Sequence, residues 1–153
     1  MQRYVAVVGS GTCSPQEAAV AEEVGALLAR AGAVVVCGGL SGVMEAACRG
    51  ARREGGLTVG ILPGNDRTAA NPDVVVAIAS GLGELRNGLV VRASDVVVAV
   101  GGEFGTLSEI GFALKLGKRV VGLGTWELSR HTDAILRAST PADALRLALP
   151  EPH

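Results

Sequence analysis

Short apolar runs alternate along the chain with longer segments whose apolar residues recur at helical spacing. Several of the short runs are continuously apolar, which is typical of parallel strands covered on both faces. The alternation therefore predicts a parallel sheet with helices packed against it. The expected strands are Tyr4–Val8, Val34–Cys37, Thr58–Leu62, Val74–Ile78, Asp95–Val100 and Arg119–Leu123. The expected helices are Pro15–Ala31, Gly42–Glu54, Leu82–Ala93 and Thr106–Leu116, with a last short helix that ends near Leu149.

Two of the expected helices begin with recognisable capping residues. Ser14 and Pro15 offer an N-cap and a proline at the first helical position, and Glu17 completes a capping box. Thr140 and Pro141 repeat the cap and the proline before the last helix. No linker or repeat interrupts residues 1–153, and the longest irregular piece, 63–73, is a polar loop that could form a lid. We expect a single domain of the α/β class, a Rossmann-like doubly wound parallel sheet with helices on both faces.

Composition narrows the class of protein. The chain is 48% hydrophobic and 19% charged, with a net charge of -1, so it has a globular composition and lacks the basic character of a nucleic-acid-binding protein. Its most apolar stretch, 89–100, is interrupted by Arg92 and Asp95, and the first residues are too short an apolar run for a signal peptide. An odd number of cysteines without a CxxC pair fits a reduced, cytoplasmic protein. We expect Cys37 and Cys48 to be buried, and Cys13 to be a structural residue in a loop.

Three of the expected strands end in glycine-rich turns. In a parallel sheet these turns lie at one edge, where main-chain N–H groups and helix N-termini can bind a phosphate. The residues concerned are Gly9, Ser10 and Gly11 in the first turn, Gly38, Gly39, Ser41 and Gly42 in the second, and Gly101, Gly102, Gly105 and Thr106 in the third.

Missing motifs exclude several kinds of phosphate chemistry. The two lysines, Lys115 and Lys118, are far from any P-loop-like glycine run, so a kinase or ATPase is not expected. The first turn lacks the third glycine of GxGxxG, and no carboxylate follows the second strand to hold an adenosine ribose, which argues against NAD. His131 and His153 are isolated, and no set of residues has the spacing of metal ligands.

The segment GGEFGTLSE, which begins at Gly101, resembles the PGGxGTxxE signature of LONELY GUY-type phosphoribohydrolases. The similarity continues through CGGLSGVMEAACRGA, ILPG and GFALKLGKRVVGLGTW, and so covers nearly the whole chain. It is strongest to a small bacterial subgroup that includes molybdenum-cofactor carrier proteins. The resemblance implies that Arg86 binds a phosphate or orients the substrate and that Glu109 acts at the glycosidic carbon. It also implies that the glycines, Met44 and Phe104 surround the ligand, and that the protein is a homodimer.

Three positions depart from the hydrolase signature. Gly101 replaces its proline, Glu103 replaces its second glycine, and Asn87 stands where the hydrolases have a lysine. An added carboxylate and a lost cation both weaken the attraction for a phosphate, so these changes count against hydrolysis more than against binding.

Structural roles are the alternatives to these functional ones. Thr106 and Glu109 also fit a T-x-x-E capping box, which would make Glu109 a helix-capping residue. Arg86 taken alone would be an exposed charge, and core or interface packing is favoured over ligand stacking for Trp126.

We therefore expect a protein that binds a nucleotide or another phosphate-bearing small molecule, and two functions remain open. The first is a nucleoside 5′-monophosphate phosphoribohydrolase, which needs no cofactor. The second is a non-catalytic carrier of molybdenum cofactor, a pterin with a phosphate tail, which would be its cargo. A pyridoxal-phosphate lysine decarboxylase, a label often given to this superfamily, is rejected because neither lysine lies beside a phosphate cradle.

Overall fold

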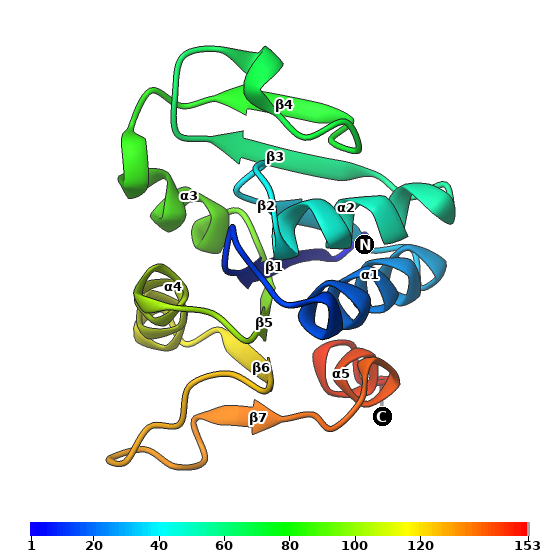
Figure 1. The fold of residues 1–153 in the computed structure, drawn as a ribbon. Coiled ribbons are helices and arrows are strands. Elements are labelled where there is room, and N and C mark those ends of the chain that lie inside the picture. The colour runs from blue at the N-terminus through cyan, green and yellow to red at the C-terminus, as the bar shows by residue number, and fades with distance from the viewer. Residues whose placement is uncertain (153) are drawn as a thin grey trace.

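The computed structural model describes residues 1–152, so His153, the last residue of the predicted domain, lies outside the described part. Seven parallel strands form one sheet in the order β4-β3-β2-β1-β5-β6-β7 (Figure 1). The strands are β1 (Tyr4–Gly9), β2 (Val34–Cys37), β3 (Thr58–Leu62), β4 (Val76–Ala79), β5 (Val96–Val100), β6 (Arg119–Leu123) and β7 (Ile135–Arg137). The predicted Rossmann-like doubly wound parallel sheet is thereby confirmed.

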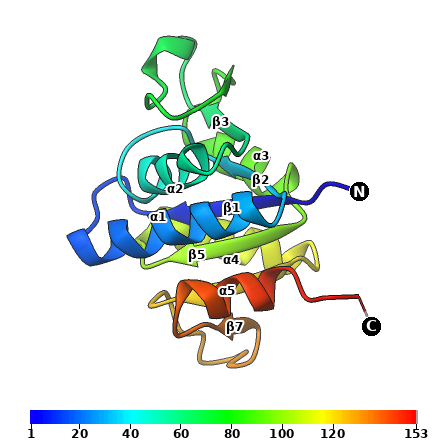
Figure 2. The same ribbon diagram turned by 90° about the vertical axis from the view of Figure 1, so that its right-hand side faces the viewer.

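The described residues form five α-helices, which divide between the two faces of the sheet (Figure 2). They are α1 (Pro15–Arg30), α2 (Val43–Arg53), α3 (Arg86–Arg92), α4 (Phe104–Lys115) and α5 (Pro141–Ala148), with short 3-10 turns at Arg67–Ala69 and Gly83–Leu85. One apolar cluster joins alternate strand residues to α1, α2 and α5, and the second joins the intervening residues to α3 and α4. This two-sided burial explains why β2 and β5 are apolar at every position.

The strand order reverses beside β1. From β1 the chain builds β2, β3 and β4 on one side and then returns to place β5, β6 and β7 on the other. The loops that follow β1 and β5 therefore lead to opposite sides of the sheet order. Open α/β sheets bind ligands at such a reversal.

Local chemistry fixes the helix starts that the sequence predicts. The Ser14 hydroxyl accepts a hydrogen bond from the Glu17 N–H, and the Glu17 carboxylate accepts one from the Ser14 N–H, both at 3.1 Å. Thr140 caps α5 in the same way, by accepting from the Asp143 N–H. Both predicted caps are confirmed.

Several boundaries differ from the prediction. The segment expected as one helix from Leu82 divides into a 3-10 turn and α3, and β7 was not predicted. β7 has three residues and lies at the edge of the sheet, so its pattern is too short to be distinguished from a loop.

The burial predicted for two of the cysteines is confirmed. Cys37 and Cys48 are fully buried, with their sulfur atoms 3.5 Å apart. Cys13 is partly buried against the core, and burial raises the pKa of its thiol. Among the described residues, no helix combines the length and apolar content needed to cross a bilayer.

Candidate functional site

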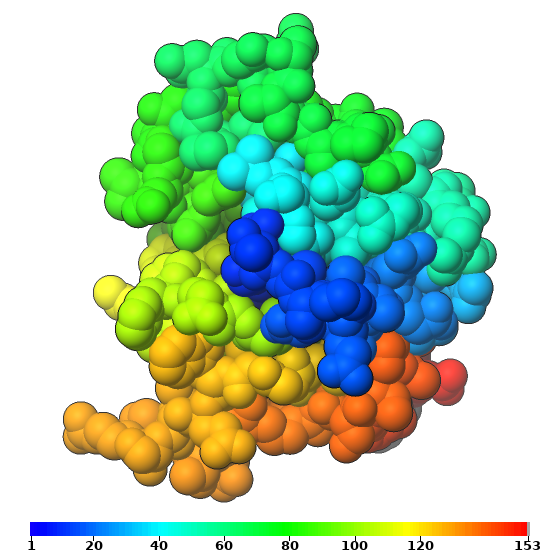
Figure 3. Space-filling model, in the orientation of Figure 1, coloured from blue at the N-terminus to red at the C-terminus, as the bar shows by residue number. Residues whose placement is uncertain are grey.

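A cavity of about 300 Å³ lies at the carboxyl end of β1, between the starts of α3 and α4. In the space-filling view, the first turn (dark blue), the second turn (cyan), α3 (green) and the start of α4 (yellow-green) meet around this region (Figure 3). Nine of the predicted site residues line it: Gly9, Ser10, Gly11, Gly38, Met44, Arg86, Gly105, Thr106 and Glu109. The sheet thus brings residues from all three glycine-rich turns to one cavity.

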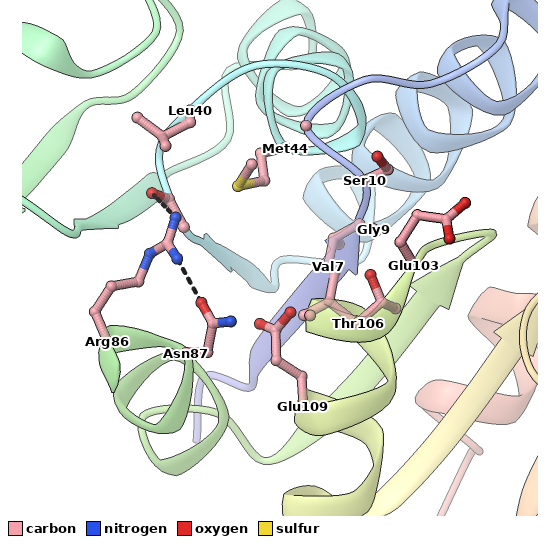
Figure 4. A pocket seen from close by; sticks show the side chains of 14 residues that line it. Val7, Gly9, Ser10, Leu40, Met44, Arg86, Asn87, Glu103, Thr106 and Glu109 are labelled. Atoms are coloured by element: carbon pink, nitrogen blue, oxygen red, sulfur yellow. Dashed lines mark hydrogen bonds between the residues drawn. The ribbon is translucent and has the colours of Figure 1, made fainter. Parts of the chain in front are cut away.

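Arg86 is the first residue of α3 and is only 8% exposed. Its Nε donates to the Ile61 carbonyl at 3.0 Å, and its Nη2 donates to the Gly38 carbonyl at 3.3 Å. Its Nη1 donates to Oδ1 of Asn87, as Figure 4 shows. Burial lowers the pKa of this guanidinium, but an arginine remains charged at neutral pH. The interactions position a buried positive charge at the wall of the cavity.

Glu109 enters the cavity from α4, opposite Arg86 (Figure 4). The residue is 9% exposed. Burial raises the pKa of its carboxyl group from 4.5 to about 8, and the nearby Arg86 offsets part of this effect. At neutral pH most of this carboxyl group is therefore protonated, so it can donate a hydrogen bond as well as accept one.

The capping-box interpretation of Glu109 is wrong. The α4 helix begins at Phe104, and its N-cap residue Glu103 makes no side-chain capping bond. Thr106 and Glu109 therefore lie inside the helix rather than at its start, and Glu109 serves no capping role. The sequence pattern was misleading because the N-cap of α4 is Glu103, three residues before the threonine.

Some predicted site residues support the first and second turns instead of lining the cavity. Ser41 donates from its hydroxyl to the Gly11 carbonyl at 2.8 Å, and the Val43 N–H donates to the Ser10 carbonyl at 3.0 Å. Gly42 has a φ of 70°, and a Cβ atom there would lie 2.2 Å from the Ser10 carbonyl oxygen. These contacts hold the two turns together. Gly39 likewise lies outside the lining and packs against Leu62.

In the third turn, too, some residues line the cavity while others pack against neighbouring parts of the chain. Gly102 adopts a φ of 104° and packs against the Thr106 side chain, where a Cβ atom would be 2.4 Å from Oγ1. Gly101 faces α1 and borders a different cavity, of about 490 Å³. Phe104 lines neither cavity, is 75% exposed and packs against Trp126. The predicted cradle at this turn is thus reduced to Gly105 and Thr106.

Five lining residues were not among the predicted site residues: Val7, Val8, Leu40, Asn87 and Glu103. Asn87 and Glu103 were named above only as departures from the hydrolase signature. Their positions, next to Arg86 and inside the glycine-rich signature, are the sequence signal that could have identified them as site residues. The apolar lining residues come from the end of β1 and from the second turn, where the sequence gives no sign of which side chains face a cavity.

The loop of residues 63–73 does not line this cavity. Its Asn71 instead anchors the second turn, because the Asn71 N–H donates to the Gly39 carbonyl and its side-chain amide donates to the Leu40 carbonyl, both at 2.9 Å. A lid role for this loop stays a prediction.

Neither lysine lines the cavity. The Lys118 ammonium donates to three main-chain carbonyls at the end of α3, those of Val91, Arg92 and Ser94. This arrangement stabilises the helix C-terminus. Within residues 1–152, no three His, Cys, Asp or Glu side chains are grouped so that they could hold a metal ion.

Comparisons with known proteins identify the family. Residues 2–147 match the model of the SLOG cluster4 family, and the chain belongs to that family. This result confirms the predicted membership of the LONELY GUY-like superfamily. An uncharacterized protein of Archaeoglobus fulgidus is 44% identical over 119 residues, which are 78% of each chain.

Two solved structures are similar over most of their length. One is the molybdenum cofactor binding protein of Rippkaea orientalis, with 36% identity, a TM-score of 0.91, and coverage of 96% of this chain and 95% of that one. The other is the molybdenum cofactor carrier protein of Chlamydomonas reinhardtii, with 34% identity, a TM-score of 0.86, and coverage of 95% and 94%.

Proposed function

We propose that this protein is a molybdenum-cofactor carrier, which binds the cofactor through its phosphate and does not transform it. The observation that carries the proposal is the likeness, at 36% and 34% identity over nearly the whole chain, to one protein that binds molybdenum cofactor and one that carries it. The cofactor would be cargo rather than a resident catalytic group.

The cavity has the chemistry that a phosphate requires. A guanidinium has five N–H groups, and three of those of Arg86 donate within the protein, so two remain for a ligand. Charge-assisted bonds from arginine to phosphate are among the strongest hydrogen bonds in proteins. The protonated Glu109 adds a neutral donor on the opposite side, so this residue does not repel an anion bound beside Arg86.

A nucleoside 5′-monophosphate phosphoribohydrolase is the second candidate, because Arg86 and Glu109 face the same cavity. Hydrolysis through an oxocarbenium-like centre would need an ionised carboxylate at the anomeric carbon. With a pKa of about 8, Glu109 is mostly neutral at pH 7 and stabilises such a charge poorly. The charge state of this residue therefore favours binding over turnover.

Incubation with a panel of nucleoside 5′-monophosphates distinguishes the two candidates. A carrier releases no ribose 5-phosphate from any of them, at pH 7 or at pH 9 where Glu109 is ionised. Ribose 5-phosphate release that disappears in Glu109→Gln would establish the hydrolase and overturn the carrier proposal. Glu103→Gln is the matched control, since Glu103 is another cavity carboxylate, but an exposed one.

We also propose that the protein is a homodimer and that it acts in the cytoplasm without nucleic acid. By the β3–β4 register, Val76 and Ile78 share the face of Val59 and Ile61, which belongs to the α3 and α4 side of the sheet. Yet Val76 and Ile78 are exposed, as are three leucines nearby in the chain: Leu82, Leu85 and Leu89. Large exposed apolar surfaces typically mark interfaces, and symmetric dimers are the commonest assembly.

The solution mass tests the dimer. Light scattering should give twice the chain mass for the wild-type protein and the monomer mass for Leu85→Glu, because Leu85 is 79% exposed and would place a charge in the interface. A wild-type monomer at micromolar concentration would contradict the proposal.

A further inference from the structure

The cavity beside Arg86 offers a charged partner for a phosphate but no stacking partner for a fused ring. Its volume of about 300 Å³ is at the lower end for ligand pockets. Charged and amide groups reach it from Arg86, Asn87, Glu103 and Glu109, and no aromatic residue is among the lining residues. A ligand that places its phosphate beside Arg86 therefore finds no aromatic ring to stack on within that lining.

An aromatic pair lies beside that lining. Phe104 stands in the chain between Glu103 and Gly105, which both line the cavity, and is 75% exposed. Its ring packs against Trp126, with the ring centroids 5.6 Å apart and the planes tilted by 31°. The chain has only one tryptophan, one tyrosine and two phenylalanines, so half of its aromatic residues gather here.

Hydrogen bonds hold this pair in place. The indole Nε1 of Trp126 donates to the Glu103 carbonyl at 3.1 Å, and Nη2 of Arg137 donates to the Trp126 carbonyl at 2.6 Å. Phe104 is thus backed by a fixed indole and presents an apolar ring to solvent. A rigid exposed aromatic ring is a surface on which a planar heterocycle stacks at little entropic cost.

We propose that Phe104, supported by Trp126, is the stacking platform for the planar fused nitrogen heterocycle of the ligand. The proposal rests on the proposed function, because it requires the phosphate of the same ligand to bind beside Arg86. The ligand class is a phosphate monoester that carries a fused heterocycle, a chemistry that purine nucleotides and pterins share. Glu103 and Gly105 connect the two parts of the site.

Trp126, the only tryptophan, reports on the platform directly. Adenosine 5′-monophosphate, 6-hydroxymethylpterin phosphate and ribose 5-phosphate would each be titrated into wild-type protein, Phe104→Leu and Phe104→Tyr. Tryptophan emission and calorimetry would be followed together. Phe104→Leu keeps the apolar volume but removes the aromatic face, whereas Phe104→Tyr restores that face. Because Phe104 is exposed, neither change disturbs the core.

At least one of the two ring-bearing probes should quench Trp126, and the quenching probe identifies whether the heterocycle is a purine or a pterin. Its affinity should fall by about five-fold or more in Phe104→Leu, as expected when a base loses a stacking partner, and should recover in Phe104→Tyr. Ribose 5-phosphate, which has no ring system to stack, should bind all three proteins equally.

Two outcomes overturn the platform while leaving the proposed function intact. One is equal affinity of the ring-bearing probe for wild-type protein and Phe104→Leu. The other is a change of solution mass in Phe104→Leu, which would assign Phe104 to a subunit interface. If none of the three probes binds the wild-type protein, the phosphate site itself fails, and the platform fails with it.

Discussion

Replacing Glu109 by glutamine should change how the stability of the protein depends on pH. Glu109 is 9% exposed, and its burial raises the pKa of the carboxyl group from 4.5 to about 8. Below pH 4.5 this group is neutral in both the folded and the unfolded chain. Between pH 4.5 and 8 it is neutral when folded but ionised when unfolded, so the folded state holds the extra proton and loses stability as the pH rises. Above pH 8 the group is ionised in both states, so a further rise in pH costs no more stability.

The magnitude follows from the size of the shift. Each pH unit inside this window costs the wild-type protein up to about 1.4 kcal/mol of unfolding free energy. Glu109→Gln cannot ionise and avoids that loss. The unfolding free energy of the variant, relative to that of the wild type, should therefore rise by up to about 4 kcal/mol between pH 5 and pH 8.

Urea denaturation followed by Trp126 fluorescence measures this difference at each pH. Glu103→Gln serves as the control, because it makes the same exchange of carboxylate for amide at an exposed position of the same cavity. If the difference between Glu109→Gln and wild type is the same at pH 5 and pH 8, Glu109 is not held neutral in the folded protein.

Four other substitutions test the capping of α1, the role of Arg86 and the backbone conformation of two glycines. Ser14→Ala should lower the unfolding free energy by about 0.5–2 kcal/mol, because it removes the capping bond to α1; urea denaturation would show an unused cap as no change. Arg86→Lys keeps a charge, but a lysine cannot reach two main-chain carbonyls and a ligand together. Calorimetry should therefore show an affinity for the phosphate ligand that is at least ten-fold lower, and an unchanged affinity would refute this role of Arg86. Gly102→Ala, at a φ of 104°, should destabilise the protein by about 1–3 kcal/mol or more. By contrast, Gly111→Ala in an open, exposed part of α4 should stabilise it slightly, and equal melting temperatures for the two variants would contradict the reasoning.

Much of the fold could be predicted because burial on both faces makes the central strands continuously apolar. The strand β5 is apolar at all five positions, and the pattern gives its position within one residue. By contrast, β7 has only three residues and ends with the exposed Arg137, so no periodicity can develop. The start of α4 was misplaced because Thr106 and Glu109 imitate a capping box.

The candidate site was predictable at the level of the sheet edge but not of individual residues. Parallel strands bring their carboxyl ends together, and the glycine-rich turns converge as expected. Which glycine faces the cavity depends on tertiary packing: Gly42 supports the first turn and Gly101 faces α1, although both belong to the same kind of motif as Gly38. The protonation of Glu109 arises from its burial, which no sequence motif encodes.

The cofactor content of the purified protein is the sharpest test of the carrier function. The wild-type protein and Arg86→Ala would be purified from cells that make molybdenum cofactor, and their molybdenum and oxidised pterin would be quantified. Wild-type protein should retain molybdenum and pterin in equal amounts, and Arg86→Ala should have lost both. Wild-type protein that contains neither, even when it is mixed with released cofactor and then separated from it by gel filtration, would contradict the carrier function.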